Sequence, residues 1–229
     1  MHPQVEAARR LWFGSFHGML STDSCVLPGY PFGSLTPVCR DHMGLPLLLL
    51  SHLAQHTRNL HHNLRCSILL TEPGHGDVQQ LGRLTCLSRA EALEPVPEGL
   101  SRRYFRYFPT AREYHEILNF RFYRLLPQRF YYIGGFGSAR WITPDHLLDK
   151  PALGLDQETE LLQRLQAEPP FSGDGDGDAA PSVVGLDPFG MDYQWNGQLN
   201  RAMFRQPAGN PERFLEAIRE LNLTRHTDD

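Results

Sequence analysis

Residues 44–60 read GLPLLLLSHLAQHTRNL, and this stretch decides the fold expected for the chain. An apolar run, Leu45 to Ser51, passes directly into a polar segment, Ala54 to Asn63, with the composition of a short helix. We therefore expect a buried strand that leads straight into a helix. The run contains Pro46 and is far too short to span a bilayer, so no membrane partner is expected.

Further strand-like runs lie on both sides of this stretch. They are rich in leucine, β-branched or aromatic residues and are bounded by glycine, proline or aspartate, which is typical of strands joined by hairpins. Pro127 and Gln128 interrupt the aromatic sequence, and we expect a hairpin turn there. Six or seven such strands predict a barrel or a sandwich. The runs are Gly18 to Thr22, Phe32 to Arg40, Leu45 to Ser51, Cys66 to Thr71, Leu81 to Glu91, Phe120 to Leu126 and Phe130 to Trp141.

Two more helices are expected among the strands. Pro3 to Ser15 places apolar residues at helical spacing. Ser101 to Leu118 is rich in aromatic residues and contains Pro109, which should divide it because proline lacks the N–H group and clashes with the preceding turn.

The charged residues divide the chain near Lys150. Residues 1–150 carry 16 basic and 12 acidic side chains and ten of the 11 histidines, whereas residues 151–229 carry 6 basic and 14 acidic side chains. The first part suits a small anionic ligand, and the second suits an appended domain. A net charge of -4 gives no reason to expect nucleic acid. Lys150 is the only lysine, beside Pro151, which excludes P-loop and Schiff-base chemistry.

We expect a strand-rich domain over 1–150, a linker over 151–181 and a small C-terminal domain over 182–229. Aspartate alternates with glycine at 174–178, but the terminal glutamate of a calcium loop is missing, so a flexible acidic linker is favoured. Four scattered cysteines without C-x-x-C spacing, and no signal-peptide pattern, favour a cytoplasmic location. The small domain should hold a strand pair, Ser182 to Tyr193 with Leu199 to Phe204, and a helix, Pro211 to Leu221, capped by Asn210.

The start of the helix at 54–63 is the strongest candidate site. Unpaired backbone amides at a helix start, with the Thr57 hydroxyl, His56 and Arg58, would bind a phosphate or carboxylate. The alternative is that the histidines of this segment are surface residues of a polar helix.

Several segments in this order resemble the haem-utilisation branch of the FMN-binding split-barrel, or pyridoxamine 5'-phosphate oxidase-like, superfamily. The resemblance covers about residues 5–149. It is carried by Pro31-Phe-Gly-Ser-Leu, Gly44-Leu-Pro-Leu-Leu-Leu-Leu-Ser, Ala54-Gln-His-Thr-Arg-Asn-Leu, Gly82-Arg-Leu-Thr, Tyr104 to Pro109 and Tyr132-Ile-Gly-Gly-Phe-Gly137.

The resemblance implies a mainly β (α+β) fold: a six-stranded split β-barrel with peripheral helices, followed by a small α+β C-terminal domain. It also implies a homodimer that binds haem or FMN between its subunits. In the flavin-binding members an arginine and a lysine neutralise the FMN phosphate, and His56 and Thr57 stand at those positions here. The implied cofactor-binding residues are Ser51, His56, Thr57, Arg58, Arg83, Gly135 and Gly137.

For haem, the resemblance implies an imidazole ligand to the iron and arginines that pair with the propionates. The candidate ligands are His56, His146 and His226, with Arg58 and Arg83 as propionate or phosphate partners. Members of the branch often carry a histidine-methionine-asparagine-x-aspartate-histidine helix in the appended domain, and this chain has none.

The leading functional interpretation is a haem- or flavin-binding oxidoreductase, with oxidative haem breakdown as its sharpest form. An FMN-dependent oxidase or reductase is the second. A haem-binding protein without turnover is the third, because a fold does not fix a function.

Overall fold

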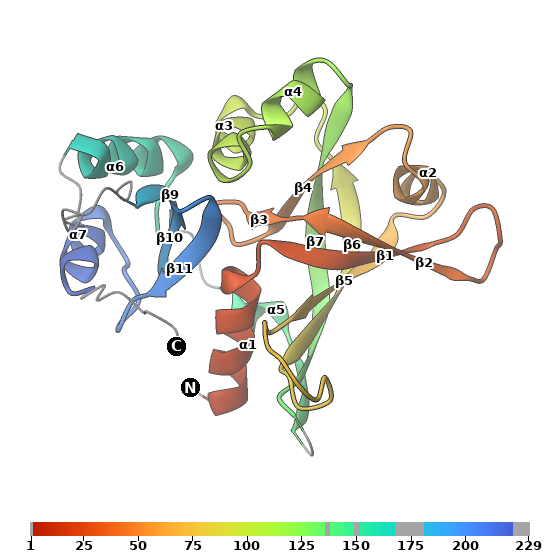
Figure 1. Cartoon of the computed structure of the whole chain (residues 1–229), viewed down its shortest axis with the longest axis horizontal. Helices are drawn as coiled ribbons and strands as arrows, with labels where there is room; N and C mark the ends of the chain where they lie inside the picture. The colour runs from red at the N-terminus through yellow and green to blue at the C-terminus, as the bar shows by residue number, and fades with distance from the viewer. Residues whose placement is uncertain (1, 136–137, 149–151, 168–180, 222–229) are drawn as a thin grey trace. The chain divides into compact units, whose positions relative to one another are not determined.

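The computed structural model of the chain describes residues 2–135, 138–148, 152–167 and 181–221 (Figure 1). It forms two compact units, Met1–Asp149 and Lys150–Asp229. No helix within the described ranges is both long and apolar enough to cross a membrane.

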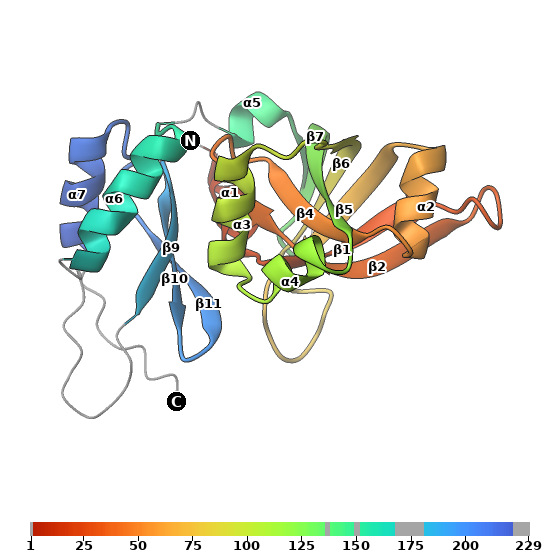
Figure 2. The same ribbon diagram turned by 90° about the horizontal axis from the view of Figure 1, so that it is seen from above.

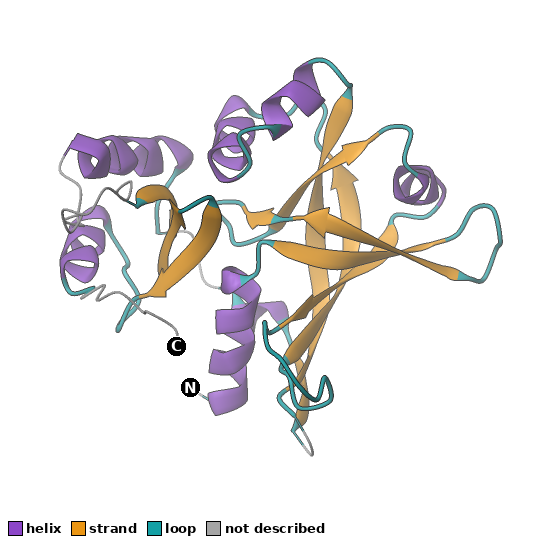
Figure 3. Cartoon of the chain, in the orientation of Figure 1, coloured by secondary structure: helices purple, strands orange, loops and turns teal. Residues whose placement is uncertain are grey.

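The first unit is a curled antiparallel sheet with helices around it, which confirms the predicted mainly β split barrel (Figure 3). The strand order is β2-β1-β5-β6-β7-β4-β3, and β8 pairs with β7. The elements are α1 (Pro3–Gly14), β1 (His17–Asp23), β2 (Pro31–Pro37), β3 (Cys39–Arg40), β4 (Pro46–Ser51), α2 (Gln55–His62), β5 (Arg65–Thr71), β6 (Arg83–Ala92), α3 (Glu98–Tyr107), α4 (Ala111–Glu116), β7 (Phe120–Ile133), β8 (Ala139–Ile142) and α5 (Pro144–Leu147).

The described part of this sheet has eight strands, more than the six expected. One reason is that residue 38 separates β3 from β2. The hairpin predicted at Pro127 and Gln128 was wrong, because both residues lie inside the continuous strand β7. Pro127 lies where the register between β6 and β7 shifts, and an irregularity of this kind accommodates a residue without an N–H group. The division of the aromatic helix at Pro109 was correct, since α3 and α4 flank it.

Side chains alternate between a buried inner face of the sheet and an outward face. One inner row crosses β1, β5, β6 and β7 through Leu20, Ile68, Cys86 and Phe130, all fully buried. Trp12 of α1 packs edge-on against Phe130, with ring centroids 4.8 Å apart. The core of the first unit therefore lies between the inner face of the sheet and α1.

Helix α2 follows β4 directly, as the sequence predicted, and lies against the β1–β2 hairpin (Figures 1 and 2). The fully buried Asn59 fastens the two together. Its side-chain oxygen accepts hydrogen bonds from the Cys25 amide at 3.0 Å and from Gln55 Nε2 at 2.8 Å, and its Nδ2 donates to Thr22 Oγ1 at 2.9 Å. These bonds fix where α2 presents its other side chains.

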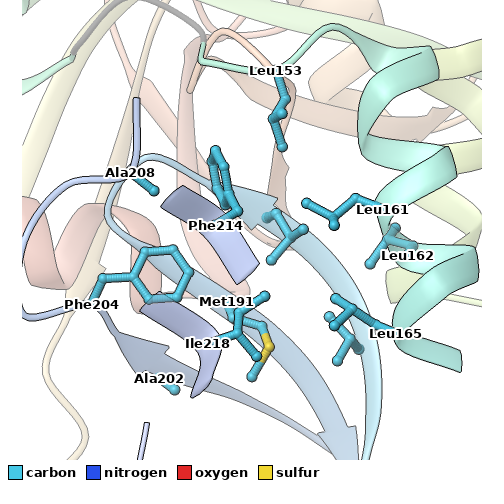
Figure 4. Close-up of a cluster of buried hydrophobic side chains, with 12 residues drawn as sticks. Leu153, Leu161, Leu162, Leu165, Met191, Ala202, Phe204, Ala208, Phe214 and Ile218 are labelled. Atoms are coloured by element: carbon cyan, nitrogen blue, oxygen red, sulfur yellow. The ribbon is translucent and has the colours of Figure 1, made fainter. Parts of the chain in front are cut away.

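The second unit has a three-stranded antiparallel sheet, in the order β11-β10-β9, with two helices. Its core is a cluster of apolar side chains that includes Phe214 and Met191 (Figure 4). The predicted strand pair is a meander of three strands, because a turn at 188–189 divides its first run. The N-cap at Asn210 is confirmed by its side-chain bond to the Arg213 amide. The elements are α6 (Leu155–Ala167), β9 (Ser182–Asp187), β10 (Gly190–Trp195), β11 (Gln198–Met203) and α7 (Pro211–Arg219).

Helix α6 occupies part of the segment expected to be a linker, over 151–181. Leu161, Leu162 and Leu165 of this helix belong to the apolar cluster, which is why the segment is ordered. The alternating aspartates at 174–178 lie outside the described residues.

A buried ion triad joins the three strands of the second unit. Arg201 of β11 donates to Asp187 of β9 at 2.6 Å and to Asp192 of β10 at 2.7 Å. All three side chains are at most 5% exposed. The two carboxylates hold the pKa of Arg201 above its ordinary value despite the opposing effect of burial.

Candidate functional site

His56 lies on α2 with its ring turned towards β2. Its Nδ1 lies 3.1 Å from Ser34 Oγ, and its enclosed Nε2 has no hydrogen-bond partner among the described residues. Burial lowers the pKa of His56, so the imidazole is neutral at pH 7. The residue at the arginine position of the flavin-binding members thus supplies no positive charge here.

The neighbouring candidate residues, Thr57 and Arg58, do not place a buried positive charge there instead. Thr57 is fully buried, and its hydroxyl donates to the Ser51 carbonyl at 2.7 Å. That bond joins the end of β4 to the first turn of α2. Arg58 is exposed on the next position of the helix. The structure therefore brings Ser51, His56 and Thr57 together at one end of the sheet, with no buried cation among them.

Arg83 and Gly135 lie at the opposite end of the sheet. Ser51 pairs with Phe120 at the start of β7, whereas Arg83 pairs with Ile133 at its end. Thirteen residue steps of about 3.3 Å separate these two ends, roughly 40 Å along the strand. Gly135 has φ +95°, a conformation that favours glycine. The predicted site residues thus form two groups, and Gly137 and His226 lie outside the described residues.

The outward face at the Arg83 end carries an aromatic pair that the sequence analysis did not single out. Tyr131 points outward and packs against Trp141 of β8 with ring centroids 4.7 Å apart, while Tyr132 points inward and is 4% exposed. Trp141 is 56% exposed. Arg129, two residues before Tyr131, is also exposed on this face. The run Arg129 to Ile133 predicts a strand with alternating faces, but it does not say which face points outward.

A mostly apolar row continues from this pair to the β2 edge of the sheet. Register pairs connect it through β7, β6, β5, β1 and β2. The two residues at its far end, Met19 and Leu35, are 41% and 68% exposed. Leu69, Thr85 and Tyr131 in its middle are half-buried, so the exposed apolar surface lies at its two ends. Exposed apolar patches mark interaction surfaces. The row consists of Trp141, Tyr131, Thr85, Leu69, Met19 and Leu35.

His146 lies on α5, directly after β8, with its side chain 69% exposed. Its Nδ1 lies 2.6 Å from Thr143 Oγ1. The nearby Thr143 hydroxyl is the main reason why the pKa of the Asp145 carboxyl is lowered, with smaller effects from His146 and Arg129. When Nδ1 donates to the Thr143 hydroxyl oxygen, the lone pair of the ring lies on Nε2.

His146 is not part of a larger metal-binding cluster among the described residues. The described residues contain no group of three or more histidine, cysteine, aspartate or glutamate side chains placed to hold a metal ion. Helix α5 is held against α1, since Arg9 donates to the carbonyl oxygens of His146 and Leu147 at 3.1 and 3.0 Å. These two bonds hold the backbone of α5 in place, and so fix the point from which the His146 side chain projects.

Two curated relatives match part of the chain. "Non-canonical heme oxygenase HOZ, chloroplastic" of Arabidopsis thaliana is 32% identical over 138 residues, which cover 59% of this chain and 41% of the plant protein. "Heme oxygenase HutZ" of Vibrio cholerae is 29% identical over 128 residues, covering 53% of this chain and 72% of HutZ. The chain thus spans about two fifths of the length of the plant relative.

Both units have a counterpart in a solved structure. Protein Atu2129 of Agrobacterium tumefaciens, of unknown function, is 26% identical with a TM-score of 0.74, over 96% of this chain and 98% of that one. The sequence model of the family described as "CREG, beta-barrel" matches residues 1–149. The chain therefore belongs to the CREG β-barrel family, a split barrel of the pyridoxamine 5'-phosphate oxidase-like type, and has curated relatives in haem utilisation.

Proposed function

We propose that the split-barrel unit binds haem on its outward face, as a homodimer, and that it acts in oxidative haem breakdown. The observation that carries the proposal is His146, an exposed imidazole whose Nδ1 lies within hydrogen-bond distance of Thr143 Oγ1. Metal-ligating histidines almost always have the second ring nitrogen hydrogen-bonded in this way. The names of the two curated relatives support the same ligand.

The residues near His146 fit a haem group. Tyr131 and Trp141 form an apolar surface for the porphyrin, and Arg129 and Arg83 lie on the same outward face, two residues on either side of that row. A guanidinium group pairs bidentately with a carboxylate, so these arginines suit the propionates. Bound haem would supply the iron that activates oxygen. The protein's own contribution is to orient the iron ligand, hold the propionates and cover the porphyrin.

The residues at the α2 end do not fit the FMN phosphate. The Thr57 hydroxyl is already donated to the Ser51 carbonyl, and the lowered pKa of His56 keeps that ring neutral. Of the predicted cofactor-binding residues at this end, the exposed Arg58 is the one whose side chain is always positively charged. Haem is therefore favoured over FMN, and the flavin-dependent oxidase or reductase is the weaker alternative.

The apolar row supports the proposed homodimer. It crosses β2, β1, β5, β6, β7 and β8, and Leu35, Met19 and Trp141 along it are substantially exposed. A two-fold axis through this face would bury the row against its own copy.

Titration of the purified protein with haemin tests the proposal. We expect a Soret band that saturates at one haem per subunit. His146→Ala should weaken it, while the matched control His62→Ala, an exposed histidine of α2, should leave it unchanged. The absence of a Soret band in the wild-type protein would overturn the proposal.

A second experiment separates an enzyme from a binding protein. The haem-loaded protein is incubated with ascorbate and oxygen. Loss of the Soret band with release of a bile pigment supports oxidative haem breakdown, whereas a stable spectrum means that the protein binds haem without turnover.

A further inference from the structure

A cavity of about 300 Å³ lies between α2, the end of β6 and the start of β7. Of the residues predicted to bind a cofactor, Thr57 alone lines it, and the Thr57 hydroxyl is already committed to Ser51. The volume is at the lower end of the range for small-molecule sites. It corresponds to about ten water molecules, and so to a ligand of about ten non-hydrogen atoms.

Three hydrogen-bonding side chains line this cavity from separate segments. His52, which precedes α2, has Nδ1 at 3.2 Å from the Asn119 carbonyl oxygen. A carbonyl oxygen only accepts, so Nδ1 of His52 is the donor in this bond. His61 of α2 has Nε2 at 3.2 Å from the Tyr123 hydroxyl. Burial raises the pKa of Tyr123, and the Glu94 carboxylate raises it further, so the phenol keeps its proton and can donate.

Two opposite charges also line the cavity. Arg121 of β7 and Glu94, just after β6, form an ion pair through one hydrogen bond, from Nη1 to Oε1. Their side chains are 45% and 66% exposed. A solvent-exposed, single-bond pair of this kind contributes little stability, so a ligand can separate it at small cost. Ala92, Leu93 and Phe122 add apolar wall, and Asn119 completes the lining.

We propose that this cavity binds a small zwitterion of the amino-acid class, with a polar side chain. Arg121 would take the carboxylate and Glu94 the ammonium group, while the side chain reaches His52, His61 and Tyr123. A simple anion fits less well, because the one arginine here is already neutralised by the one glutamate. The proposal is independent of haem binding, which concerns the opposite end of β7.

Isothermal titration with L-glutamine, a zwitterion of about ten non-hydrogen atoms, tests the proposal. Its two matched probes are 4-aminobutanamide, which lacks the carboxylate, and glutaramate, which lacks the amine. We expect L-glutamine to bind and each probe to bind at least tenfold more weakly, because each loses one charge-assisted contact. No binding of L-glutamine, or equal binding of a probe that lacks one charge, would overturn the proposal.

Two variants test whether L-glutamine binds in this cavity. Glu94→Gln and Arg121→Gln should each weaken L-glutamine binding roughly tenfold to a hundredfold, the range for losing one charge-assisted hydrogen bond. The control is Glu98→Gln, which removes a similar exposed ion pair with Arg102 on α3 and should leave the affinity unchanged. Unchanged affinity in both cavity variants would contradict the proposal.

The outcome is separable from that of the proposed function. Glu94→Gln should bind haemin as the wild-type protein does, and His146→Ala should bind L-glutamine with the affinity of the wild-type protein.

Discussion

Asn59→Ala should destabilise the first unit by about 3 kcal/mol. The fully buried side chain makes three hydrogen bonds of 2.8 to 3.0 Å, to Cys25, Gln55 and Thr22. At about 1 kcal/mol net for each bond, their loss costs about 3 kcal/mol. The Cys25 amide, left without its acceptor, adds about 1 kcal/mol more. The better helix propensity of alanine offsets about 0.6 kcal/mol of this total.

Urea unfolding followed by tryptophan fluorescence measures the change. Trp12 and Trp141 lie in the first unit, and a Trp195→Phe background removes the signal of the second. The matched control is Arg58→Ala on the neighbouring, exposed position of α2, which should change the free energy of unfolding by no more than about 0.5 kcal/mol. A loss below about 1 kcal/mol for Asn59→Ala, or equal losses for both variants, would refute the argument that this side chain fastens α2 to the hairpin.

Three further predictions follow from the described contacts. Thr143→Val should weaken haemin binding by about tenfold to a hundredfold, the usual effect of losing the hydrogen bond behind a metal-ligating histidine, and a spectrophotometric titration measures it. Arg201→Met should lower the free energy of unfolding of the second unit by about 3–5 kcal/mol, because two buried carboxylates lose their partner; Trp195 fluorescence reports this, and a change under about 1 kcal/mol would contradict it. Burial raises the pKa of Cys66 and Cys86 from 9.0 to about 12, so both thiols should resist iodoacetamide at pH 8 until the chain is unfolded, as mass spectrometry would show. The same shift makes folding stability fall as the pH rises from about 9 towards 12, because the unfolded chain loses these thiol protons first.

The sequence predicted the fold well where local signals agree with tertiary packing. The passage from β4 into α2 is read directly from residues 44–60, and the break at Pro109 follows from the missing N–H group. The prediction was wrong at Pro127. A proline by itself signals a turn, whereas the pairing of β6 with β7 places this residue at a register shift inside a strand. Local chemistry does not reveal the partner strand.

The candidate site was predicted only in part, since proximity in a sheet depends on register. Residues 51–58 were expected together and lie together, but Arg83 and Gly135 lie at the other end of β7. Whether Tyr131 or Tyr132 faces inward could not be predicted, because a shift of one residue exchanges the two faces of a strand. The role of Thr143 depends on a bond to His146 that becomes visible only in the folded turn.

The strand order also bears on how the first unit folds. β5, β6 and β7 join in sequence order, but β4 pairs with β7, with about 70 residues between partners such as Leu50 and Arg121. Closing so long a loop costs entropy before any contact forms, and pairings of this kind slow folding. We therefore expect β4 to dock late, and α2 follows it directly. The His56 end of the barrel, and the cavity beside it, would then be the last part of the unit to form.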